Sequence, residues 1–259
     1  MCATMLDRMG LDPGFLIGGI VEGYDTNGKN GSGDYFVAEA DESDSSFLFL
    51  NPNVVIVTNV EADHLDHYSG IEEIEATFAK FMSLVGEDGT VIVCGEDPHL
   101  VELAKSTAVT CFPTALREQR HRLHAPGCQG IQSDFIVRFE DGTEHAVEIK
   151  SNPGRHNMLN ATAVLTVAHV LGLDIDAAAK ALSSFEGVRR RFTHVGDIDG
   201  ITVVDDYGHH PTEIKATLAA ASSLATSTST SCSSRTAIRA CRPCATTLPM
   251  HLPMPINCC

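Results

Sequence analysis

The sequence lacks a surplus of basic residues: among its 259 residues, 34 Asp and Glu outnumber 18 Lys and Arg, giving a net charge of −16. This charge argues against a protein that holds nucleic acid or an anionic membrane surface by bulk attraction. No apolar run approaches the roughly 18 residues that a membrane span requires. The first residues also lack the basic and apolar segments of a secretion signal. We therefore expect a soluble, cytoplasmic protein without membrane insertion.

The nine cysteines lack the paired spacing of a disulfide framework, and five of them lie at or after Cys232. An odd number without a secretion signal indicates free thiols. Cys241-Arg-Pro-Cys244 has the spacing of half a zinc site, but no second pair or nearby group of histidines completes it. We interpret that spacing as chance.

Up to about Ala221, short apolar runs alternate with segments of helical periodicity. This order is typical of a doubly wound α/β domain with a mostly parallel sheet. The alternation is interrupted by one predicted hairpin, in which Phe135, Val137 and Phe139 precede a turn at 140–142. The expected strands are 35–38, 54–57, 91–93 and 201–204, and the expected helices are 71–84, 99–105, 157–171, 174–185 and 211–224.

Acidic residues follow two of these strands at their carboxyl ends, where open α/β sheets bind ligands. Residues 39–44 hold four carboxylates, which suit Mg²⁺, although a solvated acidic turn with helix caps is the alternative. Residues 58–67 follow what should be a neighbouring strand. Because the pattern repeats, we expect Glu39 and His64 to share a metal and phosphate site.

Three further motifs carry polar groups. Pro153–Asn160 opens a helix whose amino end favours an anion, and Asn157 and Asn160, one turn apart, could read a purine edge; helix capping is the alternative. The arginines of 189–191 suit phosphate, unless they are an exposed basic run. Residues 204–211 deliver polar side chains from a third strand end.

One segment imitates a phosphate-binding loop. Residues 23–30 match the spacing GxxxxGK, but the motif ends in Asn30 rather than Ser or Thr. The Gly31-Ser-Gly33 that follows cannot begin the required helix. We predict a surface loop here.

Taken together, the motifs resemble the Mur ligases of peptidoglycan synthesis, and among them the type that acts on UDP-N-acetylmuramate and L-alanine; the related muropeptide-recycling ligase is similar in design. The resemblance implies a Mur ligase central ATPase domain over residues 1–191, the start of the C-terminal α/β domain over 192–221, and a disordered tail over 222–259. The motifs that carry it are 39–44, 58–64, 153–157, 190–192 and 205–211.

The resemblance also implies a reaction. ATP, with Mg²⁺, would phosphorylate the carboxylate of UDP-N-acetylmuramate to an acyl phosphate, which the amine of L-alanine attacks. The catalytic set would be Glu39, His64, Arg191, Tyr207 and His209. Of these, Glu39 and His64 would be the Mg²⁺ ligands, Arg191 a γ-phosphate contact, and Tyr207 and His209 would face the substrates. The remaining nucleotide contacts would be His156, Asn157 and Asn160 at adenine, and Asp206.

The family's Gly-Lys-Thr-Thr phosphate loop would lie immediately before Met1, and Met1–Gly10 resembles the rest of the helix that follows it. The UDP-binding domain would also be missing. The residue composition of 222–259, which includes no Asp or Glu, resembles that of translation in a wrong frame. We therefore expect a fragment that is inactive alone. The alternative is a non-catalytic remnant that binds nucleotide or another protein; the oligomeric state stays open.

Overall fold

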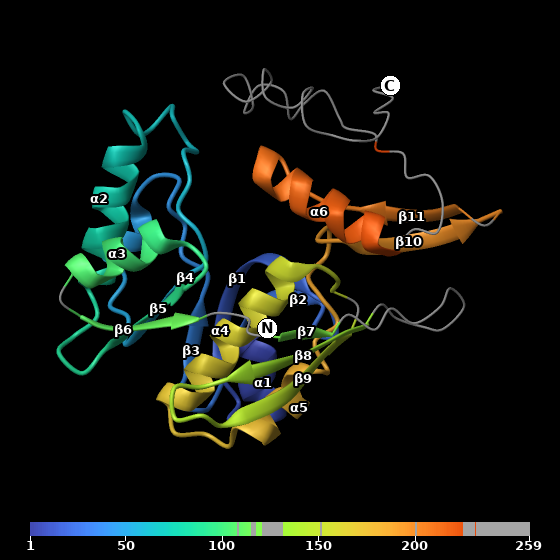
Figure 1. Ribbon diagram of the computed structural model, residues 1–259, viewed down its shortest axis with the longest axis horizontal. Coiled ribbons are helices and arrows are strands. Elements are labelled where there is room, and N and C mark those ends of the chain that lie inside the picture. Colours follow the sequence, from blue (N-terminus) through green and yellow to red (C-terminus); the bar gives the residue numbers. More distant parts are fainter. Residues whose placement is uncertain are drawn as a thin grey trace.

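A computed structural model describes residues 1–107, 109–114, 118–120, 132–150, 152–199, 201–224 and 231. Strands β4 (Val54–Val57), β5 (Thr90–Cys94) and β6 (Thr110–Thr114) form a parallel sheet in the order β4-β5-β6. Helices α2 (Ile71–Met82) and α3 (Pro98–Ser106) connect them, as the alternation predicts (Figure 1). The α/β prediction is confirmed here.

A second sheet has the order β2-β1-β3, with β1 (Gly14–Val21) parallel to β3 (Phe36–Ala38) and antiparallel to β2 (Thr26–Lys29). The prediction of a surface loop over 23–30 is therefore wrong for Thr26–Lys29, which is a strand. β3 and β4 also belong to different hydrogen-bonded sheets among the described residues, so the expectation that they are neighbouring strands of one sheet is wrong.

Two ion pairs hold the last residue of the polar strand β2. Lys29 Nζ lies 2.7 Å from carboxylate oxygens of both Asp7 and Asp12. These contacts raise the pKa of Lys29, and the hydrogen bond from Lys29 lowers the pKa of each carboxyl. The lysine of the GxxxxGK pattern is therefore already neutralised, which agrees with rejecting the segment as a phosphate loop.

The predicted hairpin is confirmed as β8 (Gln132–Arg138) and β9 (Glu144–Lys150), which pair in an antiparallel sheet with β7 (Glu118–Arg120). Gly142 in its turn has φ +87°, a conformation that favours glycine. Helices α1 (Cys2–Arg8), α4 (Arg155–Val170) and α5 (Ile175–Leu182) pack with this sheet in the largest apolar cluster.

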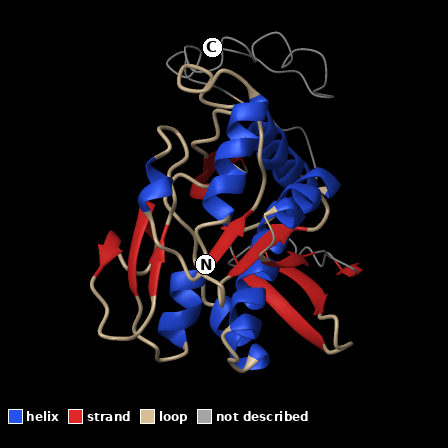
Figure 2. Cartoon of the chain, turned by 90° about the vertical axis from the view of Figure 1, so that its left-hand side faces the viewer, coloured by secondary structure: helices blue, strands red, loops and turns tan. Residues whose placement is uncertain are grey.

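Helix α4 lies near the centre of the molecule in Figure 1, and the view turned by 90° in Figure 2 shows helices with strands on either side. Eight consecutive residues, 161–168, are buried, because the helix packs on two sides. Leu165 belongs to the cluster with the antiparallel sheet, whereas Ala163 and Val167 contact Ile92 of β5. The position of α4 is therefore fixed from both directions by close packing.

The helices α1–α5 and strands β1–β9 form a first unit. The chain leaves this unit through residues 187–189, which lie against the end of β1. Val188 forms an antiparallel bridge with Val21, and the Arg189 N–H donates to the Ile20 carbonyl at 2.9 Å. Arg190 and Phe192 then have φ of 63° and 52°, the left-handed region that non-glycine residues rarely adopt. The chain therefore turns sharply at this point.

After the turn, a second unit contains the antiparallel strands β10 (Thr193–Ile198) and β11 (Ile201–Asp205) and helix α6 (Pro211–Leu224), drawn as one orange group in Figure 1. Residues 222–224 of the predicted tail form the end of α6, and apart from residue 231 the rest lies outside the described residues. No helix in the described part of the chain has the length and apolar character to cross a membrane.

The prediction of free thiols is confirmed for Cys2, Cys94 and Cys111, which carry no disulfide. Cys241 and Cys244 lie outside the described residues.

Candidate functional site

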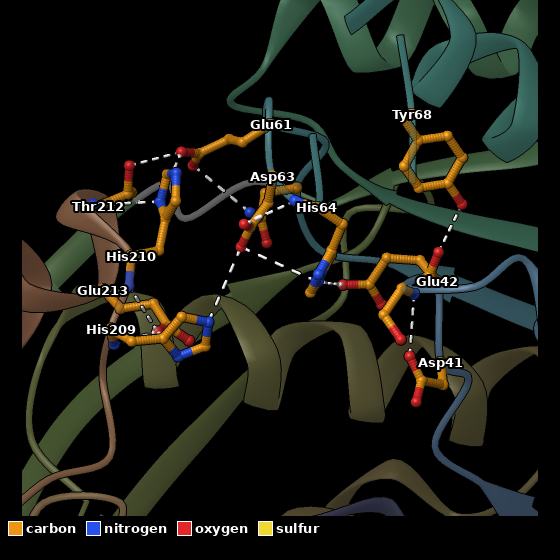
Figure 3. Close-up of polar contacts among 12 residues, drawn as sticks. Asp41, Glu42, Glu61, Asp63, His64, Tyr68, His209, His210, Thr212 and Glu213 are labelled. Carbon is orange, nitrogen blue, oxygen red and sulfur yellow. Dashed lines mark hydrogen bonds and ion pairs between the residues drawn. The ribbon is translucent and has the colours of Figure 1, made fainter. Parts of the chain in front are cut away.

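Three segments meet in Figure 3: the loop after β3, the loop after β4, and the start of α6. The first two are joined by hydrogen bonds. The Tyr68 hydroxyl donates to the Glu42 carbonyl, and the Ser45 hydroxyl lies 3.0 Å from the Tyr68 oxygen and 3.2 Å from His67 Nε2. The ends of β3 and β4 are therefore brought together although the two strands share no ladder.

The carboxylate that the structure places beside His64 is Glu42, whose Oε1 lies 3.4 Å from His64 Nε2. Glu39, the predicted partner, instead accepts a hydrogen bond from the Gly18 N–H at 2.9 Å. Within the described residues, Glu39 and His64 make no direct contact. The run of four carboxylates in the sequence contains no signal that would rank Glu42 above Glu39.

The donor chemistry of this edge suits a hard cation at Glu39. One of its carboxylate oxygens is anchored by Gly18, and its Oε1 receives no hydrogen bond from the described residues. The described part of the chain holds no group of three or more His, Cys, Asp or Glu side chains that could enclose a metal ion. Mg²⁺ needs no such cage, since one or two carboxylates, waters and phosphate oxygens complete its shell.

Glu213 organises the start of α6. Its Oε2 accepts hydrogen bonds from the N–H groups of His209 (3.0 Å) and His210 (3.3 Å), and its Oε1 accepts one from Arg191 Nη1 at 3.0 Å. Burial disfavours ionisation of this carboxyl, but the His209 amide and the Arg191 guanidinium outweigh burial and hold its pKa below the usual value. Sequence reasoning missed Glu213, although a Glu at the third helical position, with Pro211 as the first, is a recognisable capping signal.

The start of α6 also contacts the loop after β4. The Thr212 hydroxyl donates to Glu61, and His210 Nδ1 lies 3.3 Å from Glu61 Oε2. His209 Nε2 lies 3.9 Å from an oxygen of Asp63. The second unit is therefore held against the loop that carries His64 (Figure 3).

Asp206 and Tyr207 occupy the segment between β11 and α6. Both Asp206 oxygens are engaged by the backbone, one by the Phe192 N–H at 2.9 Å and the other by the Gly208 N–H at 2.7 Å. Asp206 therefore stabilises the turn at Phe192, a role that sequence reasoning did not predict. Tyr207 is 54% exposed, and the Arg190 guanidinium lies 4.4 Å from the centre of its ring.

The amino end of α4 presents the predicted nucleotide contacts. Gly154, with φ +105°, precedes the helix. Burial lowers the pKa of His156 while nearby Asp206 opposes that shift, so the imidazole favours its neutral form. Asn157 Nδ2 donates to the Pro153 carbonyl at 3.0 Å.

The side chain of Asn160 differs from that of Asn157. It is half-buried, and no hydrogen bond to it comes from the described residues. An amide with an unused donor and acceptor suits the edge of a purine base. Asn160 is therefore free to bind a ligand, whereas Asn157 also holds the start of the helix.

The chain matches two family models: residues 26–168 match the one described as Mur ligase middle domain, and residues 190–232 match Mur ligase, glutamate ligase domain. It is similar to UDP-N-acetylmuramate–L-alanine ligases, with 44% identity over 230 residues to that of Geotalea daltonii and 44% over 227 residues to that of Pelobacter propionicus. Each match covers 85% of this chain and 48% of the relative, so the chain spans about half the length of these curated relatives.

The chain is also similar in fold to solved structures of ligases. The UDP-N-acetylmuramate–alanine ligase MurC of Thermotoga maritima superposes with a TM-score of 0.72 at 28% identity, covering 89% of this chain and 52% of that one. A murein peptide ligase of Psychrobacter arcticus gives a TM-score of 0.64 at 27% identity, with 89% and 53% covered.

Proposed function

We propose, because the chain belongs to the Mur ligase family, that it serves the ATP-dependent joining of L-alanine to UDP-N-acetylmuramate in the synthesis of peptidoglycan precursors in the cytoplasm. The observation that carries the proposal is the meeting of three polar segments at one edge of the fold (Figure 3). The 44% identity to ligases of this name supports the choice of substrates.

The nucleotide would lie between the amino end of α4 and the turn at Arg191. Asn157 and Asn160 offer hydrogen-bonding groups to adenine, with the largely neutral His156 beside them. Arg191 would contact the γ-phosphate. Because Arg191 is paired with Glu213 at 3.0 Å, the phosphate would have to draw the guanidinium away or share it.

Mg²⁺ would be held by Glu39, with His64 completing the protein's share of its ligands. When bound, the ion neutralises charge on the phosphate oxygens, which is the main requirement of phosphoryl transfer. Glu42, beside His64, adds negative charge that would help to retain a cation at this edge.

The reaction would proceed in two transfers. A carboxylate oxygen of UDP-N-acetylmuramate attacks the γ-phosphorus, giving an acyl phosphate and ADP. The alanine amine then attacks the acyl carbon, and phosphate leaves as the amide forms and a proton is released. Tyr207 and His209, on the segment that faces the loop after β4, would orient these substrates.

Isothermal titration of the chain with ATP and Mg²⁺, followed by phosphate release with both substrates, tests the proposal. We expect binding that Asn160→Ala weakens by about tenfold, the effect of one lost hydrogen bond to a ligand. Asn51→Ala, which removes an exposed amide away from the site, is the matched control.

The outcomes separate the alternatives. Phosphate release that depends on both UDP-N-acetylmuramate and L-alanine would establish the ligase. Nucleotide binding without release would point to a non-catalytic nucleotide-binding protein. Absence of binding in the unmodified, folded chain would refute the proposal.

A further inference from the structure

Glu61 connects two parts of the chain that are 151 residues apart, by accepting a hydrogen bond from the Thr212 hydroxyl. The His210 imidazole lies 3.3 Å from the same carboxylate, and the side chains of His210 and Glu61 are 18% and 32% exposed. Asn59 Nδ2 supports Glu61 from its own loop at 3.4 Å. The His210–Glu61 contact is thus partly shielded from water, whereas the Thr212 hydrogen bond lies at the exposed surface, and Glu61 is held from both sides (Figure 3).

The position of Glu61 relative to α6 is electrostatically favourable. The first turn of a helix carries unsatisfied N–H groups and the positive end of the helix dipole, so a carboxylate stabilises it. Glu213 already satisfies the amides of His209 and His210 from within the helix. Glu61 supplies a second negative charge, from the other unit, and so attracts α6 to the loop after β4.

The hydroxyl of Thr212 is the constant partner in this contact. His210 Nδ1 can accept from the Thr212 N–H at 3.4 Å or donate to Glu61 at 3.3 Å, but one ring nitrogen cannot do both at once. In either state the Thr212 hydroxyl continues to donate to Glu61. The Thr212 hydrogen bond is therefore the part of the docking that does not require a proton on His210 Nδ1.

The docking also determines the placement of the residues next to it. His209 precedes the helix and lies 3.9 Å from Asp63, which is adjacent to His64. Tyr207 packs beside His209, with ring centres 5.9 Å apart. A shift of the first turn of α6 would therefore move both side chains relative to His64.

We propose that Glu61 is a positioning residue, which docks the first turn of α6 on the loop carrying His64 and so sets where Tyr207 and His209 lie. The roles of those two side chains rest on the proposed function. The docking itself requires no nucleotide and can be measured without one.

Hydrogen–deuterium exchange of the full chain, without ligand, tests the docking. In Glu61→Ala we expect residues 58–66 and 209–216 to exchange about tenfold faster, the factor that corresponds to one hydrogen bond to a charged group. Glu61→Gln, which keeps an acceptor oxygen but no charge, should give a smaller increase. Exchange in α4 should stay unchanged, which shows that the fold is intact.

Thr212 provides the matched pair. Thr212→Val removes the hydroxyl at nearly constant shape and should reproduce the faster exchange, whereas Thr212→Ser keeps the hydroxyl and should restore the slow exchange. Glu87→Gln is the control for loss of charge, since Glu87 is exposed and makes no hydrogen bond or ion pair with described residues. Unchanged exchange in Glu61→Ala, or equally fast exchange in the Ser and Val variants, would overturn the proposal.

Nucleotide binding distinguishes this proposal from the proposed function. If Glu61 only positions α6, Glu61→Gln should leave the Kd for ATP, measured by isothermal titration, within about twofold of the unmodified chain. A chain that binds no ATP but shows the exchange pattern would refute the ligase proposal and retain the docking. A tenfold loss of ATP affinity in Glu61→Gln would overturn the positioning role, because Glu61 would then act on the nucleotide.

Discussion

Helices α4 and α6 both begin with a polar motif of the candidate site, yet different forces hold them in place. Eight consecutive residues of α4 are buried between two apolar clusters. In α6, Pro211 and Ala220 are the buried residues among those whose side chains are described. Its first turn is held by Glu61 and Glu213 through hydrogen bonds and ion pairs.

The two helices should therefore differ in how strongly salt and pH affect the way they are held in place. Close packing of apolar side chains depends little on salt or pH. A partly exposed ion pair, in contrast, weakens when the salt concentration rises or when its carboxylate is protonated at low pH. The proposed adenine contacts therefore lie on a rigid element, and the proposed substrate contacts lie beside an adjustable one. The nucleotide would meet a preformed surface, while the geometry of the transfer step would depend on how α6 docks.

The largest effect should come from breaking the packing of α4. Leu165 is fully buried. Leu165→Ala should lower the free energy of unfolding by about 2–5 kcal/mol, through lost transfer energy and a cavity. Urea denaturation followed by circular dichroism measures this. Leu165→Met, which conserves volume, should cost less than about 1.5 kcal/mol; a loss below that value in the Ala variant would show that α4 is not held by packing.

A smaller effect should follow from weakening the first turn of α6. Glu213→Gln keeps the shape and an acceptor oxygen but removes the charge that pairs with Arg191, and it should cost about 0.2–1 kcal/mol, the range for a partly exposed ion pair. Because the folded pKa of Glu213 is lowered, its contribution is present above the unfolded pKa and lost as the pH falls through the folded pKa. Denaturation at neutral and acid pH should show the difference between wild type and variant disappearing in acid.

Salt should separate the two helices without any substitution. Raising the ionic strength from about 0.05 to 0.5 M screens exposed pairs, whose strength is about 0.2–1 kcal/mol. Amides of 209–216 should therefore exchange about twofold faster, and those of 161–168 at an unchanged rate. Equal responses in the two helices would remove the distinction between them.

The smallest effect concerns His156, the histidine at the start of α4 whose pKa is lowered by burial. Since burial lowers its folded pKa, the neutral form stabilises the fold above the unfolded pKa of about 6.5, and that stability is lost as the pH falls through the folded value. His156→Gln should flatten this part of the pH profile. Thermal unfolding between pH 7 and 5 checks it, and an unchanged slope would exclude His156 as a source of the pH dependence.

The sequence predicts best the elements whose apolar residues must be buried. The run Val54–Val57 and the apolar stretch of α4 form a strand and a helix on burial alone. β1 was not predicted, since Gly18 and Gly19 interrupt its apolar pattern. The polar residues Thr26–Lys29 favour a loop in the sequence, and their pairing with β1 and the ion pairs of Lys29 with Asp7 and Asp12 appear only in the folded chain.

The candidate site shows the same limit. Strand ends identified the loops that carry Glu39 and His64, but β3 and β4 belong to different sheets, and their loops meet through the hydrogen bonds of Tyr68 and Ser45. The partners that the structure gives, Glu42 for His64 and Glu61 for Thr212, depend on how separate units meet. The roles assigned to Asn160 at adenine and to His209 at the substrates stay predictions.

The short ladder between β1 and residues 187–189 has a consequence for how the units encounter each other. Because Val188 and Arg189 are bound to the first unit, the second unit is carried on a pivot at Arg190–Phe192 rather than on a long tether. A pivot this short gives the start of α6 a high effective concentration at the loop after β4. A docking energy of only about 1 kcal/mol then populates the docked arrangement roughly fivefold over the open one, leaving both within reach of a ligand.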